Sequence, residues 1–208
     1  MWHKEILSEA QVGLLPTVMR FRDHFGLVGG TAVALYVGPR ESIDFDLFPK
    51  DPKAPFSPRL LKNRFERGAL LGKTLVQSES EITFYTKSKV KVTFYNFQYN
   101  LPFTTPLDSV IDMPDLLTLA AMKAFAIGQR AKWKDYVDLY FLIRDHHSVH
   151  EISAQAKDLF GGDFNALLFR EQLAYFGRMR YDEPVIFRPG FEVPEDEIKR
   201  AFQRYSTD

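Results

Sequence analysis

The chain has 208 residues, 45% of them hydrophobic, which suits one domain or a compact core with a helical extension. Its 27 basic and 27 acidic residues balance, which argues against binding to nucleic acid through a strongly basic overall charge. The absence of cysteine excludes disulfides and thiolate metal sites and fits a reducing compartment. Because no segment has the pattern of a signal peptide or a membrane span, we expect a soluble, cytoplasmic protein without membrane contact.

Hydrophobic periodicity predicts alternating helices and strands in the first half of the chain. The expected helices cover 4–24, 31–38 and 59–71, and the expected strands cover 26–28, 42–48, 75–85 and 90–97. Pro16 starts or bends a second helix within the first of these ranges. A polar segment, 86–89, predicts a hairpin between the last two strands.

The second half of the chain predicts helices only. Asp112 is expected to cap a helix with Pro114 in its first turn, where a missing N–H costs nothing. The expected helices cover 112–128, 132–143, 149–160, 163–180 and 195–205. The fold class is therefore α+β, with a small mixed β-sheet flanked by helices in 1–110 and a C-terminal helical subdomain and tail in 111–208.

Two acidic residues lie close together in the expected strand 42–48. Asp44 and Asp46 are two positions apart, so both side chains leave one face of the strand, while the apolar residues beside them occupy the other. Carboxylates this close repel each other unless a cation lies between them. Mg²⁺, or Mn²⁺ in its place, prefers oxygen ligands, and paired carboxylates that hold such ions serve group transfer from a nucleoside triphosphate.

A glycine turn precedes this strand. Gly29 and Gly30 follow a short apolar run, and Thr31 opens the next helix. Glycines let the backbone approach a phosphate, and a helix N-terminus adds exposed N–H groups and the positive end of the dipole. The Thr31 hydroxyl either caps the helix or binds a phosphate oxygen. A lone glycine pair is usually a plain turn, and a lone Asp-x-Asp is usually a solvated strand face, but the two in this order indicate a phosphate site.

The stretch LVGGTAVALYVGPRESIDFDLF, residues 27–48, resembles the signature of polymerase-beta-like nucleotidyltransferases, and within them the AbiEii/AbiGii toxin family of bacterial type IV toxin–antitoxin systems. That family has a Gly-Gly-Ser/Thr turn, then an arginine and a serine, then an Asp-x-Asp strand. The matching residues are Gly29, Gly30, Thr31, Arg40, Ser42, Asp44 and Asp46. The resemblance implies that the first five bind phosphate or nucleotide, and that the two aspartates bind the metal and are catalytic.

A second stretch, MPDLLTLAAMKAFAIGQRAKWKDYVDLYFL, resembles the later helical motif of that family. The matching residues are Lys123, Arg130, Lys134, Asp135 and Asp138. The resemblance implies that Lys123 and Asp135 are catalytic, with Lys123 in contact with the triphosphate and Asp135 helping to order the site. It also implies that Arg130 belongs to the nucleotide-binding group. Without the resemblance, Lys123 is either a functional residue or a lysine that extends to solvent from a mostly apolar helix.

The resemblance implies a Mg²⁺-dependent enzyme that transfers a nucleotidyl group from a nucleoside triphosphate to an RNA or tRNA end or to a protein, with an antitoxin protein as a further partner. The alternative is a catalytically weak or inactive nucleotide-binding or partner-binding module on the same fold. Thr93 favours this alternative, because many nucleotidyltransferases place a third carboxylate on a later strand. Either two carboxylates suffice, or Glu79 or Glu81 assists, or metal binding is weak.

Two further segments allow more than one interpretation. Arg144 and His150 are spaced as in the HEPN ribonuclease motif, but Ser148 predicts a helix break between them. The histidines of 146–150 are otherwise metal ligands or residues of an exposed helix end. The basic residues of the expected helix 59–71 either form a solvated face or contact RNA phosphates.

Overall fold

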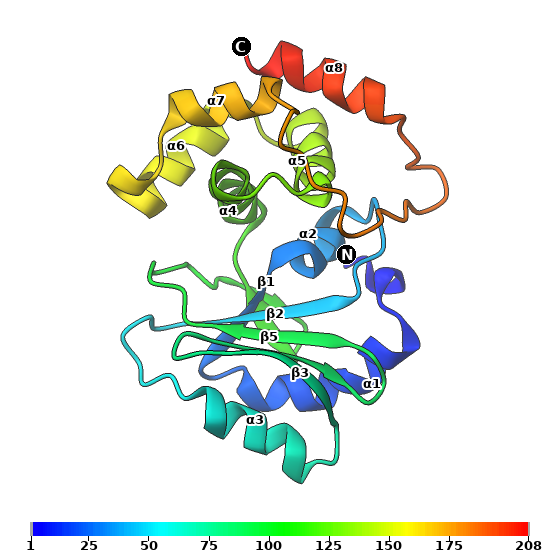
Figure 1. The fold of residues 1–208 in the computed structure, drawn as a ribbon, viewed down its shortest axis with the longest axis vertical. Helices are drawn as coiled ribbons and strands as arrows, with labels where there is room; N and C mark the ends of the chain where they lie inside the picture. The colour runs from blue at the N-terminus through cyan, green and yellow to red at the C-terminus, as the bar shows by residue number, and fades with distance from the viewer. Residues whose placement is uncertain (1, 208) are drawn as a thin grey trace. The chain divides into compact units, whose positions relative to one another are not determined.

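The computed structural model describes residues 2–207, which form eight α-helices and two β-sheets (Figure 1). The α+β fold class expected from the sequence is confirmed. The chain divides into two compact units, one of Met1–Ala32 and Ser42–Asp115, the other of Val33–Glu41 and Leu116–Asp208. Compared with the division expected at residue 110, the segment 33–41 thus joins the helical unit.

The first unit is built on a mixed sheet with the strand order β1-β2-β5-β4-β3. β2 pairs parallel with β5, and the other neighbours pair antiparallel. A second sheet consists of β6 and β7. The strands are β1 (Phe25–Val28), β2 (Asp44–Pro49), β3 (Leu71–Gln77), β4 (Glu81–Thr86), β5 (Lys91–Tyr95), β6 (Thr105–Leu107) and β7 (Ile111–Met113).

Helices α1 (Glu9–Val18) and α3 (Pro58–Arg67) run along one side of this sheet (Figure 1). The 3₁₀ turns η1 (Lys4–Ile6) and η2 (Met19–Phe21) flank α1. Phe21 of η2, Phe65 of α3 and Phe94 of β5 are buried together. The ring centroids of Phe21 lie 5.0 Å from Phe94 and 5.8 Å from Phe65. An aromatic cluster therefore joins helix and sheet, which accounts for part of the high phenylalanine content.

The run of residues expected to form one strand over 75–85 is divided by a turn. β3 begins earlier, at Leu71, and the Ser78 N–H donates to the Glu81 carbonyl at 2.8 Å, which closes the turn between β3 and β4. Both sides of the turn carry residues that favour strands, so composition did not reveal it. The hairpin expected at 86–89 joins β4 and β5.

The helix start expected at Asp112 is wrong. Asp112 lies in β7, and its carboxylate accepts a hydrogen bond from Lys50 Nζ at 2.6 Å. The helix begins only at Leu116. A capping aspartate and a strand aspartate with a distant lysine partner look alike in sequence, because the lysine is far away along the chain.

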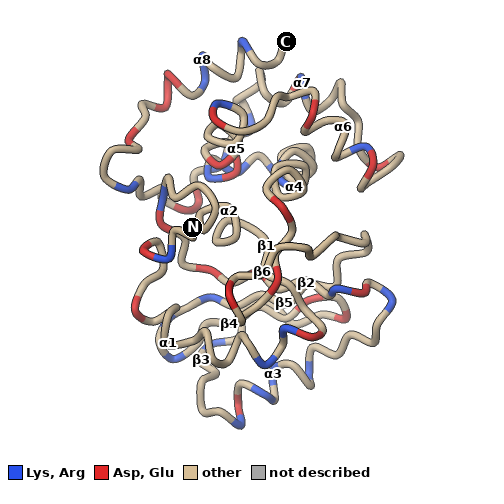
Figure 2. The backbone as a smooth tube through the Cα atoms, turned by 180° about the vertical axis from the view of Figure 1, so that it is seen from behind, with Lys and Arg blue, Asp and Glu red and all other residues tan. Residues whose placement is uncertain are grey.

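The second unit is helical. Its helices after residue 115 are α4 (Leu116–Gln129), α5 (Trp133–Asp145), α6 (Val149–Phe160), α7 (Ala166–Ala174) and α8 (Glu195–Tyr205), with the 3₁₀ turn η3 (Gly161–Asp163) before α7. Phe125 of α4 stacks on Phe160 of α6 at 4.2 Å, and Tyr136 of α5 meets Phe202 of α8 edge-on at 5.6 Å. Within 2–207, no helix is both long enough and apolar enough to cross a bilayer. Basic and acidic residues are interspersed in both units (Figure 2), which agrees with the neutral overall charge.

Residues after α2 (Gly29–Val37) pair with the C-terminal tail inside the second unit. The Glu41 N–H donates to the Ile186 carbonyl at 2.9 Å, and the Arg188 N–H donates to the Pro39 carbonyl at 3.0 Å. Arg40 lies between these two hydrogen bonds, opposite Phe187. The C-terminal tail thus fixes the backbone around Arg40, the arginine of the first motif.

The ribonuclease interpretation of the histidine segment does not fit the structure. α5 ends at Asp145, and Ser148 begins α6 with a capping box, in which its side chain and that of Glu151 bond reciprocally to the backbone. Arg144 and His150 therefore lie on different helices. Arg144 forms a bidentate ion pair with Asp145 instead.

We expect Phe94→Ala to lower the free energy of unfolding by about 3–5 kcal/mol, because it leaves a cavity among packed aromatic rings. Urea denaturation followed by circular dichroism measures this change. Leu60→Ala is the control: Leu60 is 60% exposed on α3, so its truncation is expected to change the stability by less than about 0.5 kcal/mol. Equal effects of the two substitutions would contradict the packing described here.

Candidate functional site

Strand β2 presents its two aspartates on one face of the sheet. Its parallel register with β5 pairs Asp44 with Lys91 and Asp46 with Thr93. Phe45, between the aspartates, is fully buried on the opposite face. The alternation in the sequence thus separates the strand into a core face and a polar face, and the core packing fixes where the carboxylates point.

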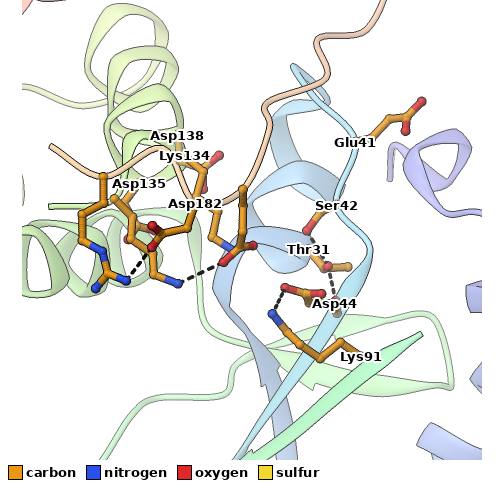
Figure 3. Close-up of polar contacts among 12 residues, drawn as sticks. Thr31, Glu41, Ser42, Asp44, Lys91, Lys134, Asp135, Asp138 and Asp182 are labelled. Atoms are coloured by element: carbon orange, nitrogen blue, oxygen red, sulfur yellow. Dashed lines mark hydrogen bonds and ion pairs between the residues drawn. The ribbon is translucent and has the colours of Figure 1, made fainter. Parts of the chain in front are cut away.

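Asp44 has a cationic partner on the neighbouring strand. Lys91 Nζ lies 2.6 Å from Asp44 Oδ2 (Figure 3). The Asp44 residue is only 8% exposed, so its charge is poorly hydrated and is stabilised by the ammonium group. Sequence reasoning missed Lys91, although its place two residues before Thr93 in an alternating strand was a signal that it shares the polar face.

Gly29 lies against the second aspartate. Antiparallel pairing of β1 with β2 sets Val28 opposite Asp46, and Gly29 turns away into α2 with a φ of +75°. A Cβ atom on Gly29 would lie 2.3 Å from Asp46 Oδ2. Any side chain would therefore both strain the backbone and collide with the carboxylate. The glycine brings the start of α2, including Gly30, close to Asp46.

Thr31 and Ser42 tie the start of α2 to the start of β2. The Thr31 hydroxyl lies 2.9 Å from Ser42 Oγ and also contacts the Asp44 carbonyl oxygen (Figure 3). Gln11 of α1 donates to the Ser42 carbonyl at 2.8 Å. Thr31 is 1% exposed. These contacts give Thr31 and Ser42 a positioning function, and their expected contact with phosphate stays a prediction.

The second motif forms a buried ion cluster within the helical unit. Lys123 Nζ of α4 lies 2.6 Å from Asp135 Oδ1 and 2.6 Å from Asp138 Oδ2, both on α5. Arg40 makes two hydrogen bonds to Asp138, from Nε at 2.7 Å and from a terminal nitrogen at 2.8 Å. The two aspartates are fully buried, and the two cations are at most 6% exposed. The cluster contains two positive and two negative groups and so balances its own charge.

Two further residues of the second motif lie at the edge of this cluster. Arg130 Nε lies 3.3 Å from Asp135 Oδ2, and about half of the Arg130 side chain is exposed. Lys134 instead forms an ion pair with Glu183, which also binds Lys132. Among the cations of the motif in this unit, Arg130 is therefore well placed to exchange its protein contact for a ligand.

The ion pairs shift the pKa values of the buried groups. Burial alone would raise the pKa of Asp135, but attraction to Lys123 and Arg130 and the hydrogen bond from Lys123 outweigh it and lower the pKa to about 2. The pKa of Asp138 is lowered in the same way, against burial, by Arg40 and Lys123. Burial acts to lower the pKa of Lys123, but the two aspartates raise it above its usual value. Lys123, Asp135 and Asp138 therefore stay charged at neutral pH.

The aspartates of β2 fit a magnesium ion by their chemistry. Mg²⁺ usually takes one or two protein carboxylates and completes its shell with water and substrate phosphates. The ammonium of Lys91 at Asp44 shows that a cation is stabilised at this face. Over 2–207, no group of three or more histidine, cysteine or acidic side chains forms a ready metal site.

The mixed sheet and the Asp-x-Asp strand beside a glycine turn define a nucleotidyltransferase fold. Over nearly its whole length, residues 18–206, the chain matches the family described as nucleotidyl transferase AbiEii toxin, type IV TA system. The chain belongs to this family of nucleotidyltransferase toxins. The recognition made from the two sequence motifs is confirmed.

The chain is also similar to individual proteins. An uncharacterised protein of Aquifex aeolicus is 29% identical over 187 residues, which are 87% of each chain. Among solved structures, MenT4, a nucleotidyltransferase toxin from Mycobacterium tuberculosis, has a TM-score of 0.61 at 13% identity and covers 96% of this chain and 83% of its own. JHP933 from Helicobacter pylori has a TM-score of 0.55 at 17% identity, with 97% and 92% covered. At these identities the solved structures bear on the fold alone.

The buried ion cluster predicts a defined loss of stability in acid. The pKa of Asp135 is about 2 when folded and 3.8 by reference, so its ionised form contributes about 2 kcal/mol that is present above pH 4 and is lost as the pH falls toward 2. Asp138, shifted in the same direction, adds to this loss. Urea denaturation at a series of pH values from 6 to 2 measures it.

Asp135→Asn is expected to be less stable at neutral pH and to show a weaker dependence of stability on pH in this range. Asp158→Asn, on the exposed side of α6, is the control and should keep the wild-type dependence. An unchanged slope in Asp135→Asn would rule out Asp135 as the group that titrates.

Proposed function

We propose that the chain transfers a nucleotidyl group from a nucleoside triphosphate to a hydroxyl of an acceptor, with Asp44 and Asp46 as the catalytic and metal-binding residues. The observation that carries this proposal is the contact geometry of β2. Two carboxylates point from one face, and Gly29 holds the start of a helix against Asp46. A helix N-terminus favours phosphate, so carboxylates and an anion-binding turn occur side by side.

In this proposal a divalent cation, Mg²⁺ or Mn²⁺, is held by Asp44 and Asp46. When bound, it would neutralise charge on the triphosphate and on the departing pyrophosphate. Gly29 and Gly30 offer backbone N–H groups to phosphate oxygens, while Thr31 and Ser42 keep the turn and the strand in register. The protein thus supplies position and charge, which are the main needs of this reaction.

The same proposal includes residues of the second unit. Lys123 and Asp135 are proposed as further catalytic residues, and Arg40 and Arg130 as residues that bind the nucleotide. Because these side chains form buried ion pairs, a substitution among them changes the stability of the protein as well as any nucleotide binding. Removing Lys123 leaves two buried carboxylates without their shared partner, which costs about 3–5 kcal/mol. Lost activity in a Lys123 variant therefore counts as a catalytic effect only if its free energy of unfolding is also measured.

The proposed function also needs an acceptor, and the family's description as a toxin–antitoxin system suggests a protein partner. We propose RNA, including tRNA ends, as the acceptor, with transfer to a protein hydroxyl as the second possibility. We also propose that the protein acts in the bacterial cytoplasm and has an antitoxin partner, as the description of the family as a type IV toxin–antitoxin system suggests. Slowed growth on overexpression, relieved by Asp46→Asn, would support the toxin assignment.

The direct test is incubation of the protein with labelled nucleoside triphosphates, Mg²⁺, total RNA and total protein. We expect label on RNA, and a loss of at least about 100-fold in Asp44→Asn and Asp46→Asn, because charge stabilisation of this kind is worth several kcal/mol. Chelation of divalent cations should abolish the transfer. The control is Asp23→Asn, whose side chain is 82% exposed.

If wild type labels neither RNA nor protein, the enzymatic proposal is refuted. Saturable, Mg²⁺-dependent triphosphate binding without transfer would then support the alternative of a non-catalytic nucleotide-binding module. The ion pair of Lys91 with Asp44 is the observation that favours this second candidate, because an ammonium group competes with a metal ion for the carboxylate.

This competition gives a separate prediction. Lys91→Met should lower the Mg²⁺ concentration needed for half-maximal nucleotide binding by several-fold, because the metal no longer displaces an ammonium from Asp44. Titration of a fluorescent triphosphate analogue at varied Mg²⁺ measures this. Lys89→Met, on the exposed turn before β5, is the matched control. A higher Mg²⁺ requirement in Lys91→Met would instead mean that Lys91 contacts the triphosphate.

A further inference from the structure

The face of the sheet that carries the aspartates also carries a row of hydroxyl groups. Pairing of β2 with β5 aligns Asp46 with Thr93, and pairing of β5 with β4 aligns Thr93 with Thr83. Directly paired residues of neighbouring strands, about 5 Å apart, project to the same face. Asp46, Thr93 and Thr83 therefore form one line across three strands.

A carboxylate ends this line. Thr83 donates a hydrogen bond from Oγ1 to Glu81 Oε1 at 2.6 Å, and Thr83 Oγ1 lies 3.2 Å from Thr93 Oγ1. A hydroxyl group has a single proton. When the proton of Thr83 points to Glu81, the proton of Thr93 completes the contact between the two threonines. Each proton in the row then points away from Asp46 and toward Glu81.

The middle of the row is shielded from water, and its ends are not. Thr83 is only 6% exposed, whereas Thr93 and Glu81 are both partly exposed. A molecule bound beside Asp46 can therefore meet Thr93, and a proton that arrives at Glu81 can pass on to solvent. Hydrogen bonds in a chain polarise one another, so a carboxylate at one end makes the hydroxyl at the other end a better proton acceptor.

We propose that Thr93, Thr83 and Glu81 form a proton relay for the attacking hydroxyl of the acceptor. The inference rests on the proposed nucleotidyl transfer. The acceptor oxygen forms a bond to the α-phosphorus, and the bond from that phosphorus to the oxygen leading to the β-phosphate breaks, which releases pyrophosphate. The acceptor proton passes to Thr93 Oγ1, the proton of Thr93 passes to Thr83, and the proton of Thr83 passes to Glu81.

In this relay Thr93 is the catalytic residue, because it touches the acceptor, and Thr83 and Glu81 act through it. Thr93 pairs with Asp46 and occupies the position at which a third acid was expected. A neutral hydroxyl there avoids a third negative charge next to two aspartates, while Glu81 supplies the base at a distance. Other charged or titratable groups also lie on this face of the sheet. They are Tyr85 of β4, Lys91 and Tyr95 of β5, and Asp44 and Asp46 of β2. On the other side of β4, the residue of β3 that pairs with Thr83 is the apolar Val76.

The test measures the rate of nucleotidyl transfer to the acceptor that wild type labels, and separately the affinity for a nonhydrolysable triphosphate. Glu81→Gln is expected to lower the rate by about 100-fold with unchanged triphosphate affinity, as for loss of a general base. Thr83→Val, which keeps the shape and removes the hydroxyl, should lower it similarly.

Rescue separates a relay from a structural role. In the double variant Glu81→Gln with Thr93→Asp, a carboxylate stands directly beside Asp46 and should restore the rate to within about tenfold of wild type. Glu79→Gln, in the exposed turn before β4, is the control and should behave as wild type. Thermal melts of each variant exclude unfolding as the cause of a lower rate.

The relay is overturned if wild type transfers label and Glu81→Gln does so at the same rate, and the proposed function then still stands. It is also overturned if Glu81→Gln is slow but Thr83→Val is not, because Glu81 would then act without the threonines. If wild type itself transfers no label, the proposed function fails, and the relay fails with it.

Discussion

The parallel pairing of β2 with β5 is the constraint on which the site in the first unit depends. Because side chains alternate along a strand, this register sends Phe45 into the core and both neighbouring aspartates to the opposite face. A slip by one residue would bury two carboxylates and expose the core phenylalanine. Burial of Phe45, with the other apolar side chains of this face, thus supplies the energy that holds Asp44 and Asp46 in place.

The ion cluster of the second unit depends on mutual compensation of buried charges. Lys123, Asp135, Asp138 and Arg40 are removed from water, and such burial costs about as much as the charges regain by attraction. Compared with well-packed apolar side chains of similar volume, the cluster therefore adds little net stability, but loss of any one member leaves a buried charge without a partner. The arrangement favours one geometry strongly over its alternatives. It also explains why a lysine occurs on the almost wholly apolar helix α4.

The sequence predicted those parts of the molecule that local patterns determine. The alternation around Asp44, the helix break at Ser148 and the glycine turn at Gly29 each specify a conformation within a few residues, and the structure has β2, the start of α6 and the start of α2 at these places. The predictions failed where a partner is distant along the chain. Asp112 lies in a strand and pairs with Lys50, and the residues around Asp112 give no sign of this distant partner.

The same limit applied to the candidate site. Arg40 and Asp138 were both recognised as motif residues, but their bidentate contact joins positions about a hundred residues apart and follows only from the fold. Likewise, Glu81 was one of two candidates for a missing acid. The proposal of Glu81 over Glu79 rests on the turn at 78–80, which sequence reasoning placed inside a strand.

The face of β2 also bears on why two aspartates and a threonine stand where other enzymes have three acids. Asp44, Asp46 and Glu81 together bring three negative charges to this face, and Lys91 returns one positive charge. Placing Glu81 at the far end of two hydroxyl groups lengthens its distance from Asp46, and Coulomb repulsion falls with distance. In the proposed relay, this face keeps a base within reach of the acceptor, and the separation of Glu81 from Asp46 limits the repulsion between their negative charges.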